Sequence, residues 1–378
     1  MKAGRTKLGS ATVLGLMAAA LVTGQTGSGG KPPMAEKVFK NVQVLKGIPV
    51  DQFMTTMGFI SASLGMTCSD CHVAESGGSW EKYADDTDLK QTTRKMLVMV
   101  SALNRTYFGG KREVTCYSCH RGGDRPKVTP SLIELYGAPP PPEPPDSIEQ
   151  AAQARPADPI LDKYIQALGG AQRLANLTSF VAKGTYVGFG ETDKTPLEIF
   201  AKAPAQRTMI VHTSIGDSIT RYDGHAGWMA APAANTPVPV LELTDGELEG
   251  AKLDADLSFP GRIKQALRQW RAGAPAIIDD HEVQMVQGTS DGRYPVNLYF
   301  DPKSGLLVRL VRYSESPLGL NPTQIDYTDY REVAGVKMPF KWTMTWLDGR
   351  ENVELTEVQP NAPIDAAKFN KPAPPAPR

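Results

Sequence analysis

The length and charge of the chain set the first limits. With 378 residues, it is long enough for two domains and too long for one small core. Acidic and basic residues are equal in number, 41 of each, so no net charge attracts nucleic acid or an anionic membrane. We therefore expect no nucleic-acid partner.

The N-terminus has the pattern of an export signal. Residues 1–24 begin with basic side chains at Lys2, Arg5 and Lys7, and an apolar run follows at 11–22. This run is shorter than the roughly 18 to 20 residues that span a bilayer, which favours a cleaved signal peptide over the alternative, an uncleaved anchor. No other segment is predicted to span a membrane, and Gln25 stands where a lipid-bearing cysteine would be needed. We expect a periplasmic protein, either free or peripheral to the membrane.

The first predicted helix is "PVDQFMTTMGFISASLG", residues 49–65. Apolar residues recur at i, i+4, i+7 and i+11 from Phe53, and Gly65 ends the pattern. Met57 lies in this stripe. Directly afterwards comes "TCSDCH", residues 67–72, in which a histidine follows two cysteines spaced three apart.

The same arrangement recurs further along the chain. A second helix is predicted from "TDLKQTTRKMLVMVSALNRTYFGG", residues 87–110, with Thr87 as its N-cap and glycines at its end. The side chains of its predicted apolar stripe are Leu89, Met96, Val100, Leu103 and Tyr107. "TCYSCH", residues 115–120, follows, so a unit of helix, glycine and C-x-x-C-H occurs twice.

These motifs contain all the cysteines of the chain, which are Cys68, Cys71, Cys116 and Cys119. An even number in an exported chain is typical of disulfides, and paired C-x-x-C motifs are also typical of zinc sites. Neither alternative explains why His72 and His120 directly follow the cysteine pairs. Covalent haem attachment uses every residue, because two sulfurs bond one porphyrin edge and the next imidazole binds the iron. We therefore predict two covalently attached c-type haems.

A haem that only carries electrons usually has a sixth ligand, His or Met. The remaining histidines, all far along the chain, are His212, His225 and His281. A methionine on a helical stripe is more often a core residue, but here both halves place one shortly before the motif. We predict Met57 and Met96 as iron ligands. The alternatives, selected by a small shift in helix phase, are Met54, Met66 and Met99.

At these residues the chain resembles a known family. "MGFISASLGMTCSDCH" and "RKMLVMVSALNRTYFGGKREVTCYSCHRGG" are similar to the cytochrome c subunit of photosynthetic reaction centres, over residues of about 34–130. The resemblance implies that each haem lies in a helix, turn and C-x-x-C-H unit, with Met57 opposite His72 and Met96 opposite His120. A typical member has four haems and a lipid-bearing cysteine, whereas this chain has two motifs and lacks that cysteine.

The second half of the chain has a different pattern. Asp158 as a cap and Pro159 at the first helical position predict one helix, and ten alternating segments then predict an antiparallel meander. The strand order and the "YFDPKSGLLVRL" hairpin resemble the half-barrel of periplasmic lipoprotein carriers (LolA/LolB-like). His225, His281 and the neighbouring aspartates are assigned no chemistry.

We therefore predict two domains. The first, residues 34–136, is a mainly α, multihaem cytochrome c domain with helix, turn and C-x-x-C-H repeated twice. The second, residues 159–370, is an α+β domain with a large curved antiparallel sheet. The other predicted segments are a signal peptide at 1–24, a proline-rich linker at 137–158 and a disordered tail at 371–378.

The predicted function is single-electron transfer and not enzymatic catalysis. The expected partners are a redox donor and acceptor, for example a membrane-bound reaction centre or a respiratory complex. Two alternatives remain: a dihaem peroxidase-like enzyme with an open iron position, and a β domain that binds an apolar ligand or lipoprotein while the haems sense redox state.

Overall fold

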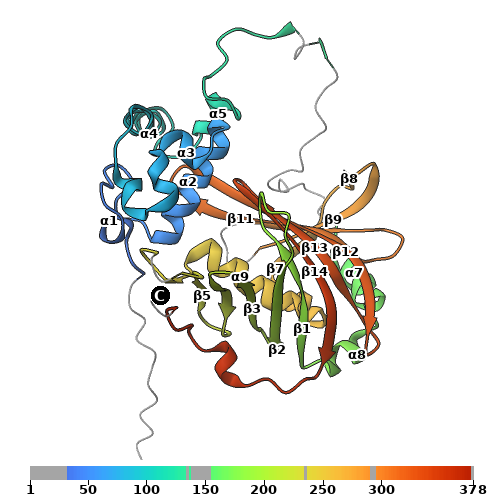
Figure 1. The fold of residues 1–378 in the computed structure, drawn as a ribbon. Coiled ribbons are helices and arrows are strands. Elements are labelled where there is room, and N and C mark those ends of the chain that lie inside the picture. The colour runs from blue at the N-terminus through green and yellow to red at the C-terminus, as the bar shows by residue number, and fades with distance from the viewer. Residues whose placement is uncertain (1–31, 133–135, 138–154, 234–235, 290–294, 376–378) are drawn as a thin grey trace, which may run out of the picture. The chain divides into compact units, whose positions relative to one another are not determined.

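The computed structural model describes residues 32–132, 136–137, 155–233, 236–289 and 295–375 (Figure 1). The predicted signal peptide, most of the predicted linker and the end of the predicted tail lie outside these residues. No helix in the described ranges has the length and apolar character needed to cross a membrane.

The N-terminal part is helical, as predicted. Its helices are α1 (Ala35–Val38), α2 (Val50–Leu64), α3 (Cys68–Cys71), η1 (Ala74–Gly78), η2 (Trp80–Ala84), α4 (Asp88–Tyr107) and α5 (Cys116–His120). Gly65 ends α2 in the left-handed conformation with φ of 63°, as the glycine at this position predicts. Thr87 caps α4 as expected, because its hydroxyl accepts a hydrogen bond from the Lys90 backbone N–H at 3.2 Å.

The buried face of α4 differs from the predicted stripe. Leu97, Val100 and Asn104 are its buried side chains. Val100 belongs to the predicted stripe, but Met96 and Tyr107 of that stripe are 37% and 73% exposed, so the stripe was right at Val100 and wrong at these two positions. A neighbouring face of α4 thus presents apolar side chains that the protein itself does not cover.

The C-terminal part is a large antiparallel sheet, also as predicted. Its strands are β1 (Ser179–Val187), β2 (Thr195–Lys202), β3 (Gln206–Thr213), β4 (Gly216–Tyr222), β5 (Gly227–Ala230), β6 (Val240–Glu242), β7 (Arg268–Ala272), β8 (Ala276–Ile278), β9 (His281–Thr289), β10 (Pro295–Phe300), β11 (Leu307–Ser316), β12 (Gly319–Val333), β13 (Val336–Trp346) and β14 (Gly349–Pro360). Across the described residues, these strands form one sheet in the order β6-β5-β4-β3-β2-β1-β14-β13-β12-β11-β10-β9-β7, with β8 beside β9.

Further helices accompany the sheet. They are α7 (Asp158–Ala167), α8 (Ala171–Asn176), α9 (Asp245–Leu257), η3 (Pro260–Arg262), α10 (Ile263–Ala266) and η4 (Ala366–Phe369). The predicted cap of α7 was wrong by one residue, because Ala157 is the N-cap and Asp158 is already helical. Helix α9 has no counterpart in the sequence predictions.

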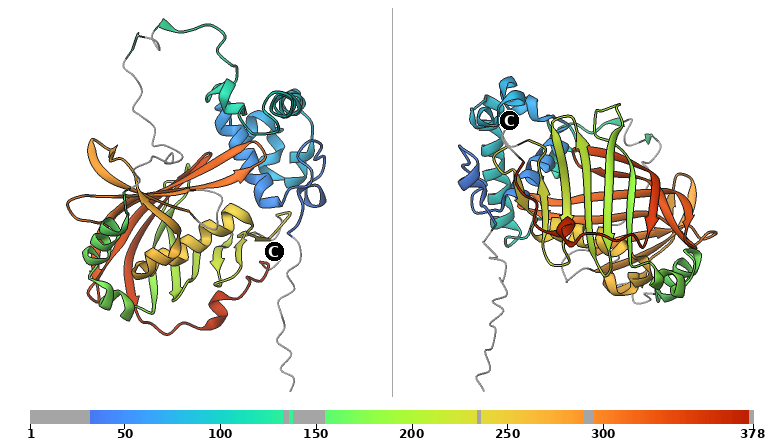
Figure 2. Two further views of the ribbon diagram at one scale, coloured as in Figure 1. Left: turned by 180° about the vertical axis from the view of Figure 1, so that it is seen from behind. Right: turned by 60° about the horizontal axis from the view of Figure 1, so that its bottom comes forward.

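The sheet curves around α9. This helix contacts β3, β4 and β5 near one end of the strand order and β11 near the other, which a flat sheet would not allow. Figure 2 shows the curvature from two further directions. The main core lies inside the curve, where α7 contributes Leu161 and the sheet contributes Leu298 and Phe300, all fully buried.

Helix α2 also packs against the sheet part. Asp51, which is buried, accepts hydrogen bonds from both the backbone N–H and the hydroxyl of Thr244, each at 2.6 Å. Phe59 lies so close to Gly319 that an added Cβ would be 2.5 Å from its ring. Arg112 pairs with Glu315 at the end of β11. Helix α2 is therefore held against β12 and the start of α9, and the segment before the second motif is held against β11.

Candidate functional site

The first C-x-x-C-H turn is ordered by its own side chains. The backbone N–H of Thr67 donates to the Asp70 carboxylate at 2.6 Å, which closes the turn that contains α3. Cys68 is exposed and Cys71 is half-buried, with the Cys71 Sγ at 3.8 Å from the Met66 Sδ. The Cys71 carbonyl accepts a hydrogen bond from the Thr87 hydroxyl at 2.6 Å, so the first motif is fixed to the start of α4.

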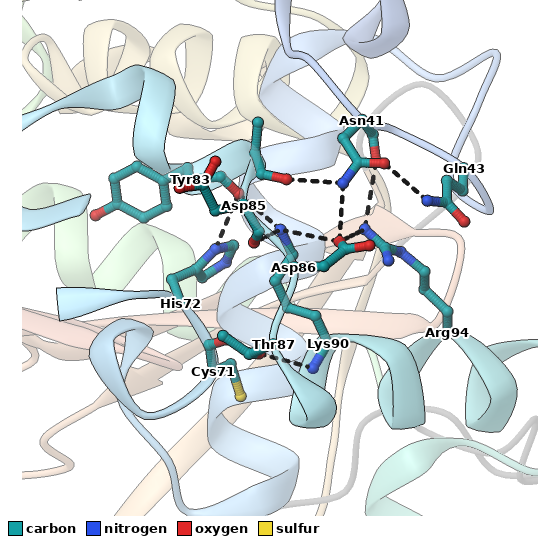
Figure 3. A network of polar contacts seen from close by, with 11 residues as sticks. Asn41, Gln43, Cys71, His72, Tyr83, Asp85, Asp86, Thr87, Lys90 and Arg94 are labelled. Atoms are coloured by element: carbon teal, nitrogen blue, oxygen red, sulfur yellow. Dashed lines mark hydrogen bonds and ion pairs between the residues drawn. The ribbon is translucent and has the colours of Figure 1, made fainter. Parts of the chain in front are cut away.

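His72 is oriented by a backbone carbonyl. Its Nδ1 lies 3.2 Å from the Tyr83 carbonyl oxygen, and the Tyr83 ring lies edge-on to the imidazole at 4.8 Å (Figure 3). A hydrogen bond from Nδ1 leaves Nε2 with the lone pair that binds a metal. Burial, followed by the nearby charge of Lys90, lowers the pKa of His72. A lowered pKa favours the neutral imidazole, which is the form that binds a metal.

A polar network holds the segment around His72. The Lys90 ammonium donates to the carbonyls of Tyr83 and Asp85 at 2.8 and 2.7 Å. Asp86 pairs with Arg94 at 2.8 Å and accepts from the Asn41 amide at the same distance (Figure 3). Burial lowers the pKa of Lys90. Sequence reasoning found none of this network, because its members come from three segments without a common local pattern.

The second C-x-x-C-H turn repeats the geometry with different residues. Thr115 and Ser118 exchange hydrogen bonds between backbone N–H and hydroxyl, at 3.0 and 3.4 Å. His120 Nδ1 lies 3.0 Å from the Gly123 carbonyl oxygen, which again leaves Nε2 for a metal. Burial raises the pKa of the Cys116 thiol, while Cys119 is exposed.

Two further contacts position the second motif. The Gly122 backbone N–H donates to the Ser63 carbonyl at 3.0 Å, so the loop after α5 lies against the end of α2. Asn104, buried on α4, donates to the Val114 carbonyl at 2.7 Å and accepts from the backbone N–H groups of Glu113 and Val114. The Asn104 side chain thus supplies hydrogen bonds to backbone groups of the segment before α5.

The cysteines are free thiols, and none is in a disulfide. Among the residues that the structure describes, no three His, Cys, Asp or Glu side chains come close enough together to hold a metal ion. The two C-x-x-C pairs therefore do not converge on the four-thiolate arrangement that the zinc alternative needs.

The predicted methionines differ in their surroundings. Met57 is partly buried and packs against a cluster that includes Phe59, Leu97 and Cys116. Met96 lies on the exposed apolar face of α4 with Met99, which is 44% exposed. Of the alternatives, Met54 faces a cavity inside the β sheet, and Met66 lies beside Cys71.

These features fit covalently bound haem. Each turn offers two unpaired thiols and an imidazole with its Nε2 available, as a thioether-linked porphyrin requires. The apolar face of α4 offers the kind of surface that a porphyrin covers.

The distant histidines have no cysteine pair beside them. His212 Nδ1 lies 2.9 Å from Asp217, and His281 Nδ1 lies 2.5 Å from the Asp279 carbonyl. Both are side chains on or beside strands.

Comparison with known proteins supports the resemblance in the N-terminal part. Residues 15–138 match the family described as photosynthetic reaction centre cytochrome C subunit. The reaction center cytochrome c subunit of Thermochromatium tepidum is 38% identical over 99 residues, which is 25% of this chain and 23% of that protein. The corresponding subunit of Rubrivivax gelatinosus is 37% identical over 100 residues, 25% of each chain. The matched region thus spans about a quarter of these relatives, and the predicted resemblance is confirmed over that region.

Solved structures resemble the C-terminal part only distantly. A LolA superfamily protein from Nitrosomonas europaea is 14% identical with a TM-score of 0.40, covering 58% of this chain and 99% of that one. A DUF1329 family protein from Desulfovibrio piger is 7% identical with a TM-score of 0.41, covering 57% of this chain and 98% of that one. The predicted likeness to LolA-type proteins is thus found, but at these scores it carries no conclusion about a ligand.

Proposed function

We propose that this protein is an exported dihaem c-type cytochrome that transfers single electrons. The observation that supports this most is the repeated turn, in which two free thiols precede an imidazole whose Nδ1 is engaged by a backbone carbonyl. Bound haem supplies an iron centre that exchanges one electron at a time.

The residues of the chain hold each haem in a defined orientation. The thiols of Cys68 and Cys71, and those of Cys116 and Cys119, would form the thioether bonds. His72 and His120 would bind the metals through Nε2, because their Nδ1 atoms are held by the Tyr83 and Gly123 carbonyls. The lowered pKa of His72 keeps protons from competing for its ring nitrogen.

Met57 and Met96 are the proposed sixth ligands, paired with His72 and His120 respectively. Both precede their motif on a helix, and a thioether sulfur in this position raises the reduction potential of a haem. Met57 packs against the same buried cluster as Cys116 of the second motif, so the variants below also test which haem each methionine serves.

A redox titration followed by optical spectroscopy tests ligation. The mature protein should contain two low-spin, six-coordinate haems, and mass spectrometry should show two covalent additions. Met57→Ala and Met96→Ala should each change the spectrum and lower the potential of one haem, whereas Met229→Ala, on β5 and never a ligand candidate, is the control. Unchanged spectra and potentials in both variants would exclude these ligands.

The same titration separates electron transfer from the peroxidase-like alternative. High-spin haem that readily binds carbon monoxide or peroxide would favour the enzyme, because an open iron position is then present. Haem that stays low-spin and unreactive supports the electron carrier.

The proposed location is the periplasm and the proposed partners are redox proteins. Similarity to reaction centre subunits makes a membrane-bound reaction centre one candidate acceptor, with a respiratory complex as the other. Flash-induced oxidation of the haems in membranes that contain reaction centres tests the first. Absence of haem oxidation there, with oxidation by respiring membranes, would assign the second.

A further inference from the structure

A cavity of about 600 Å³ lies on the concave face of the sheet, next to α9. This volume is within the range of about 300 to 1,000 Å³ that small-molecule sites occupy. None of the proposed haem ligands lines it, although Met54, one of the alternative ligands, does.

One wall of the cavity is apolar because of the strand register. Ile199, Met209, Thr220, Met229 and Leu241 are successive cross-strand partners from β2 to β6, so their side chains point to the same face. All of them line the cavity. Apart from one threonine, this row of side chains is apolar. It therefore forms a wall that can contact the apolar part of a ligand.

The opposite wall carries a polar cluster on β11 and β12. Ser314 pairs directly with Asn321, and Arg312, two residues along β11, pairs with Thr323. Residues two apart on a strand share a face, so these side chains point into the same cavity, which they line. Gly250 on α9 leaves room for the guanidinium, since an added Cβ would be 2.2 Å from the Arg312 Nη1.

This cluster has hydrogen-bonding capacity that the protein does not use. Arg312, Ser314 and Asn321 are 9%, 3% and 6% exposed. In the described part of the chain, Nε and Nη1 of Arg312, Oγ of Ser314 and both amide atoms of Asn321 have no hydrogen-bond partner. Buried polar atoms are nearly always paired in folded proteins, so unpaired ones gathered in a cavity point to a ligand. Most of these atoms are donors, and one group is cationic, so the matching ligand group has acceptor oxygens and negative charge.

Two arginines and five carboxyl groups face the cavity. The titratable side chains that line it are Asp51, Arg207, Glu247, Asp254, Arg312, Tyr327, Asp348 and Glu351. Burial raises the pKa of Asp254 and of Glu351, which favours their uncharged forms. Arg312 and Arg207 act against this rise in pKa at Asp254, so the electrostatics of the cavity couple both arginines to that carboxyl group.

A second cavity beside α9 does not compete for this role. It has a volume of about 650 Å³ and is also bordered by Arg312, but neither Ser314 nor Asn321 lines it. Only the first of these two cavities is lined by all three residues.

We propose that the first cavity binds an amphipathic carboxylic acid with a long alkyl chain. The carboxylate accepts hydrogen bonds from Arg312, Ser314 and Asn321, and the chain lies along the apolar wall toward Met209 and Met229. Trp342 and Trp346 on β13 line the same space and report its occupancy.

The test is binding of palmitate to the delipidated full-length haem protein, followed by calorimetry and by tryptophan fluorescence. Hexadecanol, with the same chain and no charge, is the matched ligand. Palmitate should bind more tightly than hexadecanol. Arg312→Met should weaken palmitate binding by about tenfold or more, because a charged hydrogen bond is lost, and should leave hexadecanol binding unchanged.

Arg271→Met is the matched control variant, because Arg271 Nε is also buried without a partner among the described residues but lies outside the cavity. Ser314→Ala and Asn321→Leu provide further variants if Arg312→Met does not fold. Absence of palmitate binding overturns the proposal. Equal binding of palmitate and hexadecanol, with no effect of these variants, also overturns it, because the cluster would then be structural. Neither result bears on the proposed electron transfer, which is measured by haem spectra.

Discussion

Gly65 shows how a single residue fixes the proposed haem sites. It ends α2 with a positive φ, and an added Cβ would lie 2.2 Å from the Gly122 carbonyl oxygen. The loop after the second motif therefore lies directly against the end of the helix before the first motif. Only glycine satisfies both the backbone conformation and the close approach.

Gly65→Ala should destabilise the protein by at least about 1 to 2 kcal/mol, the cost of the left-handed conformation alone, with the clash in addition. The free energy of unfolding from urea titrations monitored by circular dichroism measures this. Gly77→Ala is the control, because nothing lies within 4 Å of its added Cβ. Equal stability of the two variants would show that Gly65 and Gly122 are not in contact.

Asn104 is a second residue on which the site depends. Asn104→Ala removes the amide that serves the Val114 carbonyl and the N–H groups of Glu113 and Val114. The part-buried Val114 groups lose these bonds, while the Glu113 N–H keeps the Lys111 carbonyl as acceptor. We expect a loss of about 3 kcal/mol and a lower yield of haem at Cys116 and Cys119. Thermal unfolding and peptide mass mapping measure the two effects, with the exposed Ser101→Ala as control. Full haem loading of both motifs together with unchanged stability would contradict this role.

At the scale of single residues, the sequence predicted those residues whose role depends only on neighbours in the chain. The Thr87 cap and the Gly65 terminus follow from short patterns, and the structure has both. Asn104 and Tyr83 were not predictable, because an asparagine on a helix and a tyrosine in a loop have many ordinary explanations. Their roles depend on backbone groups brought to them by the fold.

At the scale of elements, helix phase was the weakest prediction. The apolar residues of α4 occupy more than one face, so the pattern did not distinguish the side that packs on protein from the side proposed to face haem. Helix α9 was missed for a different reason. Its buried residues include Gly250, Ala251 and Ala255, which are small and give a weak amphipathic signal. The antiparallel strands were predictable because their alternation is local.

The contact between α2 and the start of α9 depends on pH through Asp51. Burial raises the pKa of Asp51 above its ordinary value of 3.8, despite the hydrogen bonds from Thr244. Between these two pKa values the folded state binds more protons than the unfolded state. The contribution of Asp51 to the free energy of unfolding therefore falls as pH rises from 3.8 through the raised pKa.

Urea unfolding across this pH range measures the effect. Asp51→Asn cannot titrate, so its stability should change less with pH than that of the wild type. Glu36→Gln is the comparison, because Glu36 is stabilised as a carboxylate by the Gly47 N–H and its pKa is lowered. Identical pH profiles for Asp51→Asn and wild type would contradict the assignment.

At the scale of the whole molecule, the contacts of α2 with the sheet part were beyond sequence reasoning. Thr244 and Gly319 lie far from α2 in the chain, and neither belongs to a pattern that indicates its partner. The predicted boundary at 137–158 describes a change in composition and remains a prediction.

Gly319→Ala tests how strongly these parts are coupled. The added methyl group would overlap the Phe59 ring, so we expect a loss of about 1 to 3 kcal/mol. Unfolding followed in the Soret band should then precede unfolding followed by the β-sheet signal, whereas Gly78→Ala should leave the two coincident. Coincident transitions of unchanged midpoint in Gly319→Ala would show that Phe59 does not pack there.

The cavity and the proposed haem sites share α2. Met54, Thr55 and Gly58 line the cavity, and Met57 lies one turn from Met54 on the same helix. If both proposals hold, saturating palmitate should shift the midpoint potential of one haem, and Met54→Ala should reduce the shift. Redox titration with and without palmitate measures it, and unchanged potentials would show that the two sites are independent.

The short turns around the cysteines have a consequence for biosynthesis. Thr67 with Asp70, and Thr115 with Ser118, close each turn through bonds that belong entirely to the polypeptide. In the proposed cytochrome, the polypeptide therefore sets the spacing of the paired sulfurs before haem is attached.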